Sequence, residues 1–457
     1  MAARRIVENS EHLTNHGLKE ARLAALDILE YGLSAVSGFE TVKHSVRLVD
    51  RTTLVVGGRR YILPDMGKVY VIGAGKAVLP MAKGLDKVLG KRIDDGLVIA
   101  KAGQTAKLSY IETRTAAHPV PDARGFRATE ELKQVAMQAG KDDIVFCLIS
   151  GGASALMPSP EDGITLSDEI ETNKLLLDSG MRIEQMNVIR NHISTLKGGR
   201  LAALLKPAKV IGLIISDEPH GSVWGPTVPD CNSFEDACNY AKAAGIWRRL
   251  PSSVRIHLLK GKEGKREGDF QCAGGSRRLP DVFNLLLANN EMACRAAFFR
   301  GKELGMKPLI LTTRLTGESS QAGRILAAMA TDSGVKSSLS GRYNLLVAGG
   351  ETTVRLEGRR GKGGPSQELA LGALSVLEPS DRVVACAMDT DGTDGPTSFA
   401  GGLIDSESLS TLADGKIRLA SALQRHDSSR LLQEMGDAII ANETGTNVMD
   451  INLIVIE

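Results

Sequence analysis

Short apolar runs alternate along the chain with amphipathic helical stretches. Each run stops at glycine, serine or an acidic residue, and a helical pattern follows the resulting loop. Uninterrupted apolar runs of this length are typical of strands covered on both faces, as in parallel sheets. Strands that alternate with helices predict βαβ units and an α/β fold. The five runs that carry this prediction are 69–72, 144–149, 210–215, 345–348 and 383–388.

A break in this pattern lies near the middle of the chain. Residues 260–275 are rich in Lys, Arg, Glu and Gly and hold almost no apolar side chain, which is typical of a linker. We predict two α/β domains, residues 1–255 and 281–457, with a linker or exposed excursion over 256–280. We expect the first domain to be a Rossmann-like three-layer parallel sheet, with the active site in the cleft between the domains, and a helix within the first twenty residues.

Composition narrows the function classes. The 457 residues include 56 basic and 54 acidic ones, for a net charge of +2, and only 4% are aromatic. This balance provides no bulk attraction to nucleic acid or anionic membrane and few rings for stacking bases. No apolar stretch approaches the roughly 18 residues of a membrane span, and no secretory signal is visible. Six scattered cysteines without a Cys-x-x-Cys pair argue against zinc and favour a reducing, cytoplasmic setting.

The loop after the first run is a candidate anion site, because ligands of open α/β sheets bind beyond the carboxyl ends of strands. It reads Gly73-Ala74-Gly75-Lys76. A Rossmann fingerprint needs glycine where Val78 stands, and a Walker A loop needs Ser or Thr where Ala77 stands. What remains is a tight turn with a lysine at a helix start, which favours an anion. A purely structural turn is an equal alternative.

The loop after the second run is Ser150-Gly151-Gly152-Ala153-Ser154. Its glycines allow close backbone approach, and its serines can donate hydrogen bonds to an anion. A nucleophilic serine is disfavoured because the Gly-x-Ser-x-Gly pattern is absent. A bare strand-to-helix turn is the alternative.

The loop that begins at Asp389 is rich in oxygen ligands. Asp389, Asp391 and Asp394 follow one strand end, which suits Mg²⁺ held beside substrate phosphates. An EF-hand is rejected because Ala400 stands at the twelfth position and because a strand precedes the loop. A solvated turn is the alternative. Glu351, in a Gly-Gly-Glu-Thr-Thr segment, is either a further metal ligand or a helix cap.

Basic residues after position 187 could grip a carboxylate or phosphate. They are Arg190, Lys197 and Arg200, although charges on helices are more often solvated, and His192 has the same ordinary interpretation. Taken together, the loops indicate an enzyme that handles nucleotide or phosphate, uses Mg²⁺ and acts on a small anionic substrate.

The order of these motifs resembles that of the class II glycerate kinases, which join an N-terminal glycerate-kinase domain to a C-terminal MOFRL domain. The resemblance covers nearly the whole chain in the family's order. The segments that carry it are 73–77, 150–156, 187–190, 196–201, 225–230, 349–354, 363–364, 367–371, 391–396 and 445–450.

The resemblance implies ATP-dependent, Mg²⁺-assisted phosphorylation of D-glycerate at its 2-hydroxyl to give 2-phosphoglycerate. The implied partners are D-glycerate and ATP, with neither nucleic acid nor membrane, and a homodimer is compatible with it. Some members carry the older name hydroxypyruvate reductase, so an NAD(P)H-dependent reductase is one alternative. A kinase or sensor for another small hydroxy acid is the other.

The resemblance also implies residue roles. Lys76 is expected to neutralise the transferring phosphoryl group and Arg190 to bind carboxylate or phosphate. Asp217, or one of the aspartates in the loop that begins at Asp389, is expected to orient the hydroxyl as base. Substrate or phosphate binding is expected from Ser150, Gly151, Gly152, Ala153, Ser154, Lys197, Glu351, Thr352, Gln367 and Lys362, and metal binding from Asp389, Asp391 and Asp394.

Two departures from the family pattern concern the site. The stretch after Asp217 is short, and Pro365-Ser366 stands where the family commonly has Arg-Asn. Pro365 has neither a charge nor a backbone N–H, although proline is well accepted in the first turn of a helix. We expect Arg359, Arg360 or, above all, Lys362 to supply the missing charge. The alternative is that these three are solvated loop charges.

Overall fold

The chain divides into two compact units that cross the predicted boundary. The computed structural model describes residues 5–63, 67–218, 223–264, 281–331, 342–355, 361–412 and 414–457. Unit 1 comprises Met1–Glu40, Ser216–Ser222 and Ala288–Glu457, and unit 2 comprises Thr41–Ile215 and Val223–Leu287. Unlike the predicted division, the first 40 residues therefore belong with the C-terminal half.

Unit 2 is built on a six-stranded sheet in the order β6-β5-β4-β7-β8-β9. All pairings from β6 to β8 are parallel. This is the doubly wound order of Rossmann folds, in which the direction of strand addition reverses between the first and fourth strands, here β4 and β7. The strands are β4 (Val69–Ala74), β5 (Asp95–Lys101), β6 (Glu112–Ala116), β7 (Ile144–Ile149), β8 (Lys209–Ile215) and β9 (Val282–Ala288).

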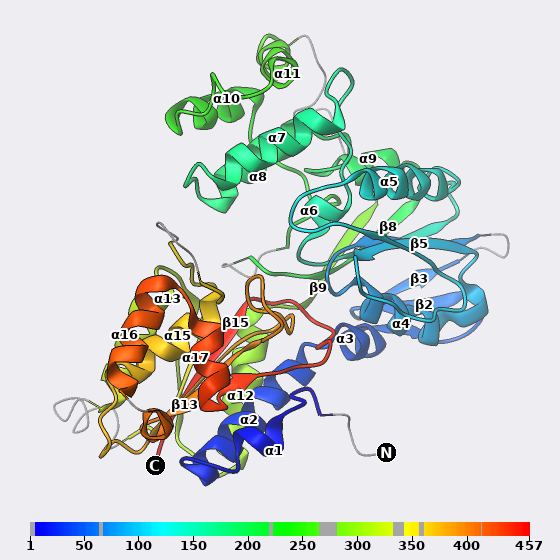
Figure 1. The fold of residues 1–457 in the computed structure, drawn as a ribbon. Helices are drawn as coiled ribbons and strands as arrows, with labels where there is room; N and C mark the ends of the chain where they lie inside the picture. The colour runs from blue at the N-terminus through cyan, green and yellow to red at the C-terminus, as the bar shows by residue number, and fades with distance from the viewer. Residues whose placement is uncertain are drawn as a thin grey trace. The chain divides into compact units, whose positions relative to one another are not determined.

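Helices cover both faces of this sheet, which confirms the predicted three layers. Every residue of β4 and β7 is buried, as the uninterrupted apolar runs predicted. Side chains of α5 (Ala123–Ala136) and α9 (Arg200–Leu204) share a hydrophobic core with one face of the sheet. Figure 1 shows α4 (Val78–Leu89) on the other face. Unit 2 also contains α6 (Ala153–Leu156), the 3-10 turn Gly90–Arg92 and a small antiparallel sheet of β1 (Val46–Leu48), β2 (Thr53–Val56) and β3 (Arg59–Ile62). The helix α3 (Gly38–Ser45) crosses the boundary between the units.

Four helices form a second core within unit 2. Buried Ile189, Phe234 and Leu258 belong to this cluster. The helices are α7 (Leu166–Leu177), α8 (Ile183–His192), α10 (Phe234–Ala243) and α11 (Ser252–Lys262). Because α11 continues to residue 262, the start of the predicted linker is helical. Its remainder, 265–280, lies outside the described residues.

Unit 1 contains a mixed six-stranded sheet in the order β10-β11-β15-β12-β13-β14. Only β10 and β11 pair in parallel, because the C-terminal strand β15 enters between β11 and β12 and runs antiparallel to both. The two apolar runs in this half are thus strands, as predicted, but they are not neighbours in a parallel sheet. The strands are β10 (Pro308–Leu315), β11 (Leu345–Gly350), β12 (Val383–Asp389), β13 (Gly401–Asp405), β14 (Ala438–Ile439) and β15 (Asp450–Ile456).

The two faces of the unit 1 sheet are covered by different helices. A core built from α13 (Ser319–Thr331), α15 (Pro365–Leu374), α16 (Gly415–Arg425) and α17 (Ser428–Met435) fills one face. On the other face, α2 (Lys19–Ala35) contacts α12 (Asn290–Glu303), β12 and β15, so the blue start and the red end of the chain lie together in Figure 1. This packing explains why the N-terminal residues belong to unit 1. Short elements complete it: α1 (Ser10–Leu13) and the 3-10 turn Ser408–Thr411.

The described cysteines are mostly apolar core residues. Cys147, Cys238, Cys294 and Cys386 are free and buried, and burial raises the pKa of the Cys147 thiol. Cys231 is in a disulfide, which the cysteine spacing did not predict. Among the described helices, none has the length and apolarity needed to cross a membrane.

Candidate functional site

Two glycine-rich turns meet in unit 2 where the strand order reverses. The Lys76 backbone N–H donates to the Gly151 carbonyl at 2.8 Å, and the Ala77 N–H donates to Ser150 Oγ at 3.0 Å. The Ser150 N–H in turn donates to the Ala74 carbonyl at 3.3 Å. The structure thus joins the two loops that the sequence singled out at the topological switch point, where doubly wound sheets bind ligands.

The two turns can approach closely because glycine has no side chain. Gly75 has φ +144°, and a Cβ there would overlap Ser150 Oγ and lie 2.7 Å from the Ser150 carbonyl oxygen. Ser150 is fully buried. Its hydroxyl holds the turn that precedes α4 and is not presented as a nucleophile. The turn itself places Lys76 just before the N-terminus of α4, where the helix dipole favours negative charge.

His118 is a neighbour of this turn that the sequence pattern did not predict. A Cβ on Gly152, whose φ is +84°, would lie 3.0 Å from His118 Cδ2 and 3.3 Å from Lys76 Cγ. The histidine follows β6, whose sequence Glu-Thr-Arg-Thr-Ala has no apolar run. The end of this strand therefore carries none of the signals that mark the ends of β4 and β7.

Arg190 and Lys197 lie in a buried polar network. Lys197 Nζ donates to Glu169 Oε1 at 3.0 Å, and both side chains are buried. Arg190 Nε donates to Asn173 Oδ1 at 2.8 Å. Burial lowers the pKa of the Arg190 guanidinium, and the charge of Glu169 opposes this shift. These three charged groups are two cations and one carboxylate, so together they carry one net positive charge that suits an anionic ligand.

Lys197→Met should destabilise the protein by about 3–5 kcal/mol, because it leaves the Glu169 carboxylate buried without its cation. Urea unfolding followed by circular dichroism measures the change. The double variant Lys197→Met/Glu169→Met should recover most of the loss, since a buried ion pair is often replaceable by apolar side chains. A single variant as stable as the wild type would refute the structural role, and a stable double variant with poor kcat/KM would support substrate binding by Lys197.

Asp394 holds the start of α15 in unit 1. Its carboxylate accepts hydrogen bonds from the Ser366 N–H at 3.2 Å, the Gln367 N–H at 2.8 Å and Gln367 Nε2 at 2.9 Å. Gly364 must lack a side chain, because a Cβ there would overlap this carboxylate. Burial raises the pKa of Asp394 to about 6, against the lowering effect of the Gln367 hydrogen bonds. Asp394 and Gln367, both predicted site residues, are therefore hydrogen-bonded to each other within unit 1.

Asp389 and Asp391 shape the turn after β12. Asp389 Oδ1 accepts from the Asp391 N–H at 2.9 Å, and Asp391 Oδ1 accepts from the Thr393 N–H and hydroxyl at 2.8 Å each. In the described parts of the chain, no three or more His, Cys, Asp or Glu side chains are grouped so that they could hold a metal ion. The three predicted ligands therefore do not form a preassembled three-carboxylate centre.

A fourth carboxylate, Asp450, was not among the predicted site residues. It begins β15 and stands directly opposite Asp389 of β12. Burial raises its pKa well above the usual range, and the charges of Asp389, Asp394 and Glu351 raise it further. Asp450 precedes its apolar run instead of following it, and the antiparallel direction of β15 brings this first residue to the same edge. The edge thus gathers carboxylates from three neighbouring strands.

The remaining predicted site residues lie on different elements of unit 1. Thr352 is buried, and its Oγ1 accepts from Ser319 Oγ at 2.9 Å. Asp217 follows β8 by two residues and belongs to unit 1. Lys362 is exposed, and its N–H donates to Asp427 Oδ1 at 3.0 Å. Pro365 is the first residue of α15, as its backbone permits. Arg359 and Arg360 lie outside the described residues.

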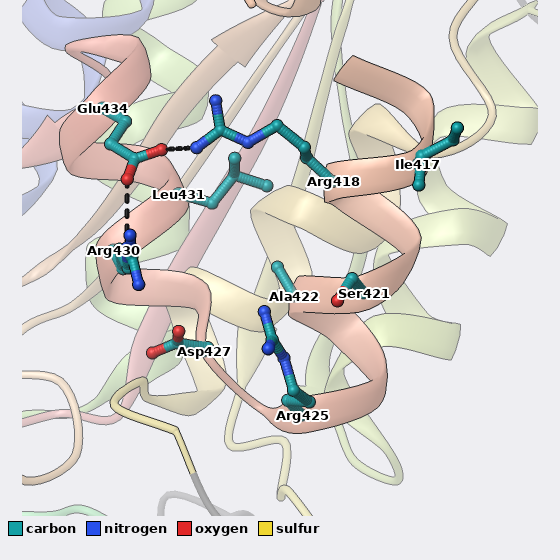
Figure 2. A pocket seen from close by; sticks show the side chains of 9 residues that line it. All are labelled: Ile417, Arg418, Ser421, Ala422, Arg425, Asp427, Arg430, Leu431 and Glu434. Carbon is teal, nitrogen blue, oxygen red and sulfur yellow. Dashed lines mark hydrogen bonds and ion pairs between the residues drawn. The ribbon is translucent and has the colours of Figure 1, made fainter. Parts of the chain in front are cut away.

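A surface cavity of about 260 Å³ lies between α16 and α17 in unit 1. Figure 2 shows Glu434 bonded to both Arg418 and Arg430 on its rim, with Arg425 and Asp427 beside them. None of the predicted site residues lines it. Two of its three arginines already have a carboxylate partner, because Glu434 bonds to both Arg418 and Arg430.

The fold and the site in unit 2 are those of the doubly wound α/β enzymes, which bind ligands where the strand order reverses. Two family models match the chain: the domain of unknown function DUF4147 over residues 24–259, and MOFRL over 344–450. The chain belongs to the family that combines these two domains, that of the glycerate 2-kinases.

Individual relatives agree over nearly the full length. A glycerate 2-kinase of Pyrococcus horikoshii is 36% identical, with 95% of this chain and 98% of the relative covered. A protein of Agrobacterium vitis, provisionally named as a hydroxypyruvate reductase, is 36% identical over 85% of this chain and 87% of its own length. The crystal structure of glycerate kinase from Thermotoga maritima matches with a TM-score of 0.77 and 32% identity, covering 95% of this chain and 99% of that one.

Proposed function

We propose that the protein is an ATP-dependent glycerate kinase that phosphorylates D-glycerate at its 2-hydroxyl, giving 2-phosphoglycerate and ADP, with Mg²⁺ as cofactor. The observation that carries the proposal is the junction of the Lys76 turn with the Ser150–Gly152 turn at the switch point of the parallel sheet. It occurs in a chain that resembles a named glycerate 2-kinase over 95% of its length.

Phosphoryl transfer requires mainly positioning and neutralisation of charge. We assign neutralisation of the transferring group to Lys76 and anchoring of phosphate or carboxylate to the loop 150–154. Arg190, in its positively charged network, binds the carboxylate or phosphate tail. Asp217 orients the 2-hydroxyl and accepts its proton. The remaining proposed contacts to nucleotide or substrate are Lys197, Glu351, Thr352, Lys362 and Gln367.

One carboxylate of unit 1 has an oxygen available to a magnesium ion, whereas two of the predicted ligands are already engaged in hydrogen bonds. Asp450 Oδ2 is buried without a hydrogen-bond partner among the described residues, which is the kind of donor atom a hard cation takes. Asp391 and Asp394 are engaged by backbone groups of their own loop and of α15. When bound, Mg²⁺ would neutralise nucleotide phosphate charge. Of the three predicted ligands, Asp389, Asp391 and Asp394, we retain Asp389, which stands directly opposite Asp450.

One assay series tests the proposal. Purified protein is incubated with D-glycerate, ATP and Mg²⁺, ADP release is followed by a coupled assay, and the phosphorylated carbon is identified by NMR. Matched reactions replace D-glycerate by L-glycerate, glycolate and lactate, and a separate reaction contains hydroxypyruvate with NADH. We expect ADP release with D-glycerate and 2-phosphoglycerate as the product. NADH oxidation without ADP release would overturn the proposal, and turnover of another hydroxy acid alone would correct its substrate.

The structure weighs against the reductase alternative at one position. The first strand-to-helix turn of a dinucleotide-binding fold uses a third glycine for close contact between helix and strand. Val78 occupies that position and is fully buried as the first residue of α4. The expected cytoplasmic location and homodimer stay predictions.

A further inference from the structure

The meeting of β11, β15 and β12 brings three carboxylates to one edge of the unit 1 sheet, where Asp450 is buried, Asp389 half-buried and Glu351 exposed. Asp450 pairs across the sheet with Asp389 on one side and with Gly350 on the other. Glu351 follows Gly350 directly. Like charges directly opposite each other in a sheet are destabilising, and burial makes each uncompensated charge more costly. Such an arrangement calls for a neutralising partner.

Several polar atoms around Asp450 lack hydrogen-bond partners in the described part of the chain. They are Asp450 Oδ2, Ser366 Oγ, and both the oxygen and the nitrogen of the Asn452 amide. Asp450 is 3% exposed, Asn452 2% and Ser366 0%. Buried polar atoms are nearly always paired in folded proteins, and exceptions often mark a missing water or ion.

These atoms face one region. Asp450 and Asn452 are two residues apart on β15, so their side chains lie on the same face of the sheet. The residues opposite Asn452 are Ala348 and Ala387, which belong to the hydrophobic core that α15 covers. Ser366 is the second residue of α15, the helix that covers this face of the sheet. Because Asp389 of β12 stands directly opposite Asp450, the strands β12 and β15 and the helix α15 all contribute polar groups to this face.

We propose that Asp450 and Asp389 are the two protein ligands of a divalent-cation site in unit 1, with Ser366 and Asn452 hydrogen-bonded to water on the ion. Mg²⁺ typically takes only one or two carboxylates and keeps several waters for later exchange with phosphate oxygens. A pair of carboxylates therefore suffices, in agreement with the lack of a three-carboxylate group among the described residues. That the ion serves a nucleotide rests on the proposed function, whereas binding of the ion does not.

This proposal changes the roles of the aspartates in the loop after β12. Asp391 and Asp394 are each held by backbone N–H groups and serve to shape the turn and to fix α15. Asp389 Oδ1 also accepts a backbone N–H, but Asp389 stands directly opposite Asp450. It therefore remains a ligand, and Asp450 takes the place of the other two.

The competing interpretation is that Asp450 is simply protonated and shares a hydrogen bond with Asp389. Binding of Mn²⁺, which prefers the same oxygen ligands as Mg²⁺, separates the two in the full-length protein. Free Mn²⁺ is followed by electron paramagnetic resonance without nucleotide or glycerate. We expect Asp450→Asn and Asp389→Asn each to weaken Mn²⁺ binding at least tenfold. Asp381→Asn, which alters a carboxylate just before the opposite end of β12, should bind as the wild type does.

An Asp450→Asn variant that folds and binds Mn²⁺ like the wild type would overturn the proposal, because asparagine preserves a hydrogen bond to Asp389 but is a poor cation ligand. If the variants do not fold, an experiment on the wild-type protein alone tests the site. Fe²⁺ with ascorbate and peroxide cleaves a backbone beside the bound metal, and mass spectrometry locates the cuts. Cuts beside residues 389 and 450, suppressed by excess Mg²⁺, support the site, and cuts confined to other segments overturn it.

The outcomes also separate this inference from the proposed function. A wild-type protein that binds Mn²⁺ through Asp450 but does not phosphorylate D-glycerate upholds the site and overturns the kinase. A protein that phosphorylates D-glycerate while Asp450→Asn retains wild-type Mn²⁺ affinity upholds the kinase and overturns the site.

Discussion

Lys76→Met should reduce the kcat of glycerate phosphorylation by about 10²–10³-fold, the loss typical of removing one preorganised charge partner of a transition state. Methionine keeps most of the length of the side chain and removes the charge. Lys76 lies in the turn that joins β4 to α4, and the hydrogen bond from its N–H to the Gly151 carbonyl fixes the point from which its side chain extends. Initial rates at saturating ATP and glycerate measure the effect.

The matched control is Lys87→Met, which removes an exposed lysine from α4, the helix that follows Lys76, and should leave kcat unchanged. Thermal unfolding of both variants checks that the fold is intact. If Lys76→Met turns over within a factor of about three of the wild type, Lys76 is an ordinary residue at a helix start. Retained activity in Lys76→Arg would show that the charge matters more than the shape of the cation.

Gly75→Ala should both destabilise unit 2 and abolish measurable turnover. Its φ of +144° is unfavourable for a residue with a side chain, and the added carbon would meet Ser150 Oγ and carbonyl oxygen. Backbone strain and overpacking together should cost about 2–5 kcal/mol. Denaturant unfolding gives the stability change, and the glycerate assay gives the activity.

Gly58→Ala separates the two causes. Gly58 also has a positive φ, +81°, but a Cβ there meets nothing within 4 Å, so this variant should lose only about 1 kcal/mol. Equal losses in the two variants would mean that the contact between the two turns is not tight. A stable but inactive Gly75→Ala would mean that the turn matters for ligand approach and not for folding.

The sequence predicted the parts of the fold that depend on local hydrophobic pattern. The runs at 69–72 and 144–149 became β4 and β7, because a strand buried on both faces must be apolar throughout. Their loops could be ranked as ligand sites because glycines at a strand end let a backbone approach an anion closely and a lysine there supplies the opposite charge. The pairing of those loops needed the sheet order, which no local pattern specifies.

The site residues that the sequence did not predict were missed for one physical reason. Their position depends on the order and direction of strands in the sheet, which the local sequence does not specify. Nothing in the run 451–456 reveals that it enters between β11 and β12 in antiparallel direction, so Asp450 could not be assigned to the acidic edge. His118 follows a polar strand that the apolar pattern does not mark. Similarly, chain order alone places the N-terminal residues in the first domain, whereas α2 packs on elements of the C-terminal half.

The interleaving of the two units has a consequence for the order in which the protein can assemble. Unit 2 takes all its elements from the stretch 41–287, so its parallel sheet can form while later residues are still being synthesised. Unit 1 cannot, since β15 lies inside its sheet and the N-terminal segment bonds to residues more than 400 positions away, as in the Asn9 side chain to the Ala438 carbonyl. Such distant contacts are slow to form. The first 40 residues therefore stay partly unburied until residues 450–456 have been synthesised. Folding of unit 1 is the stage at which the chain is most prone to aggregation and to binding by chaperones.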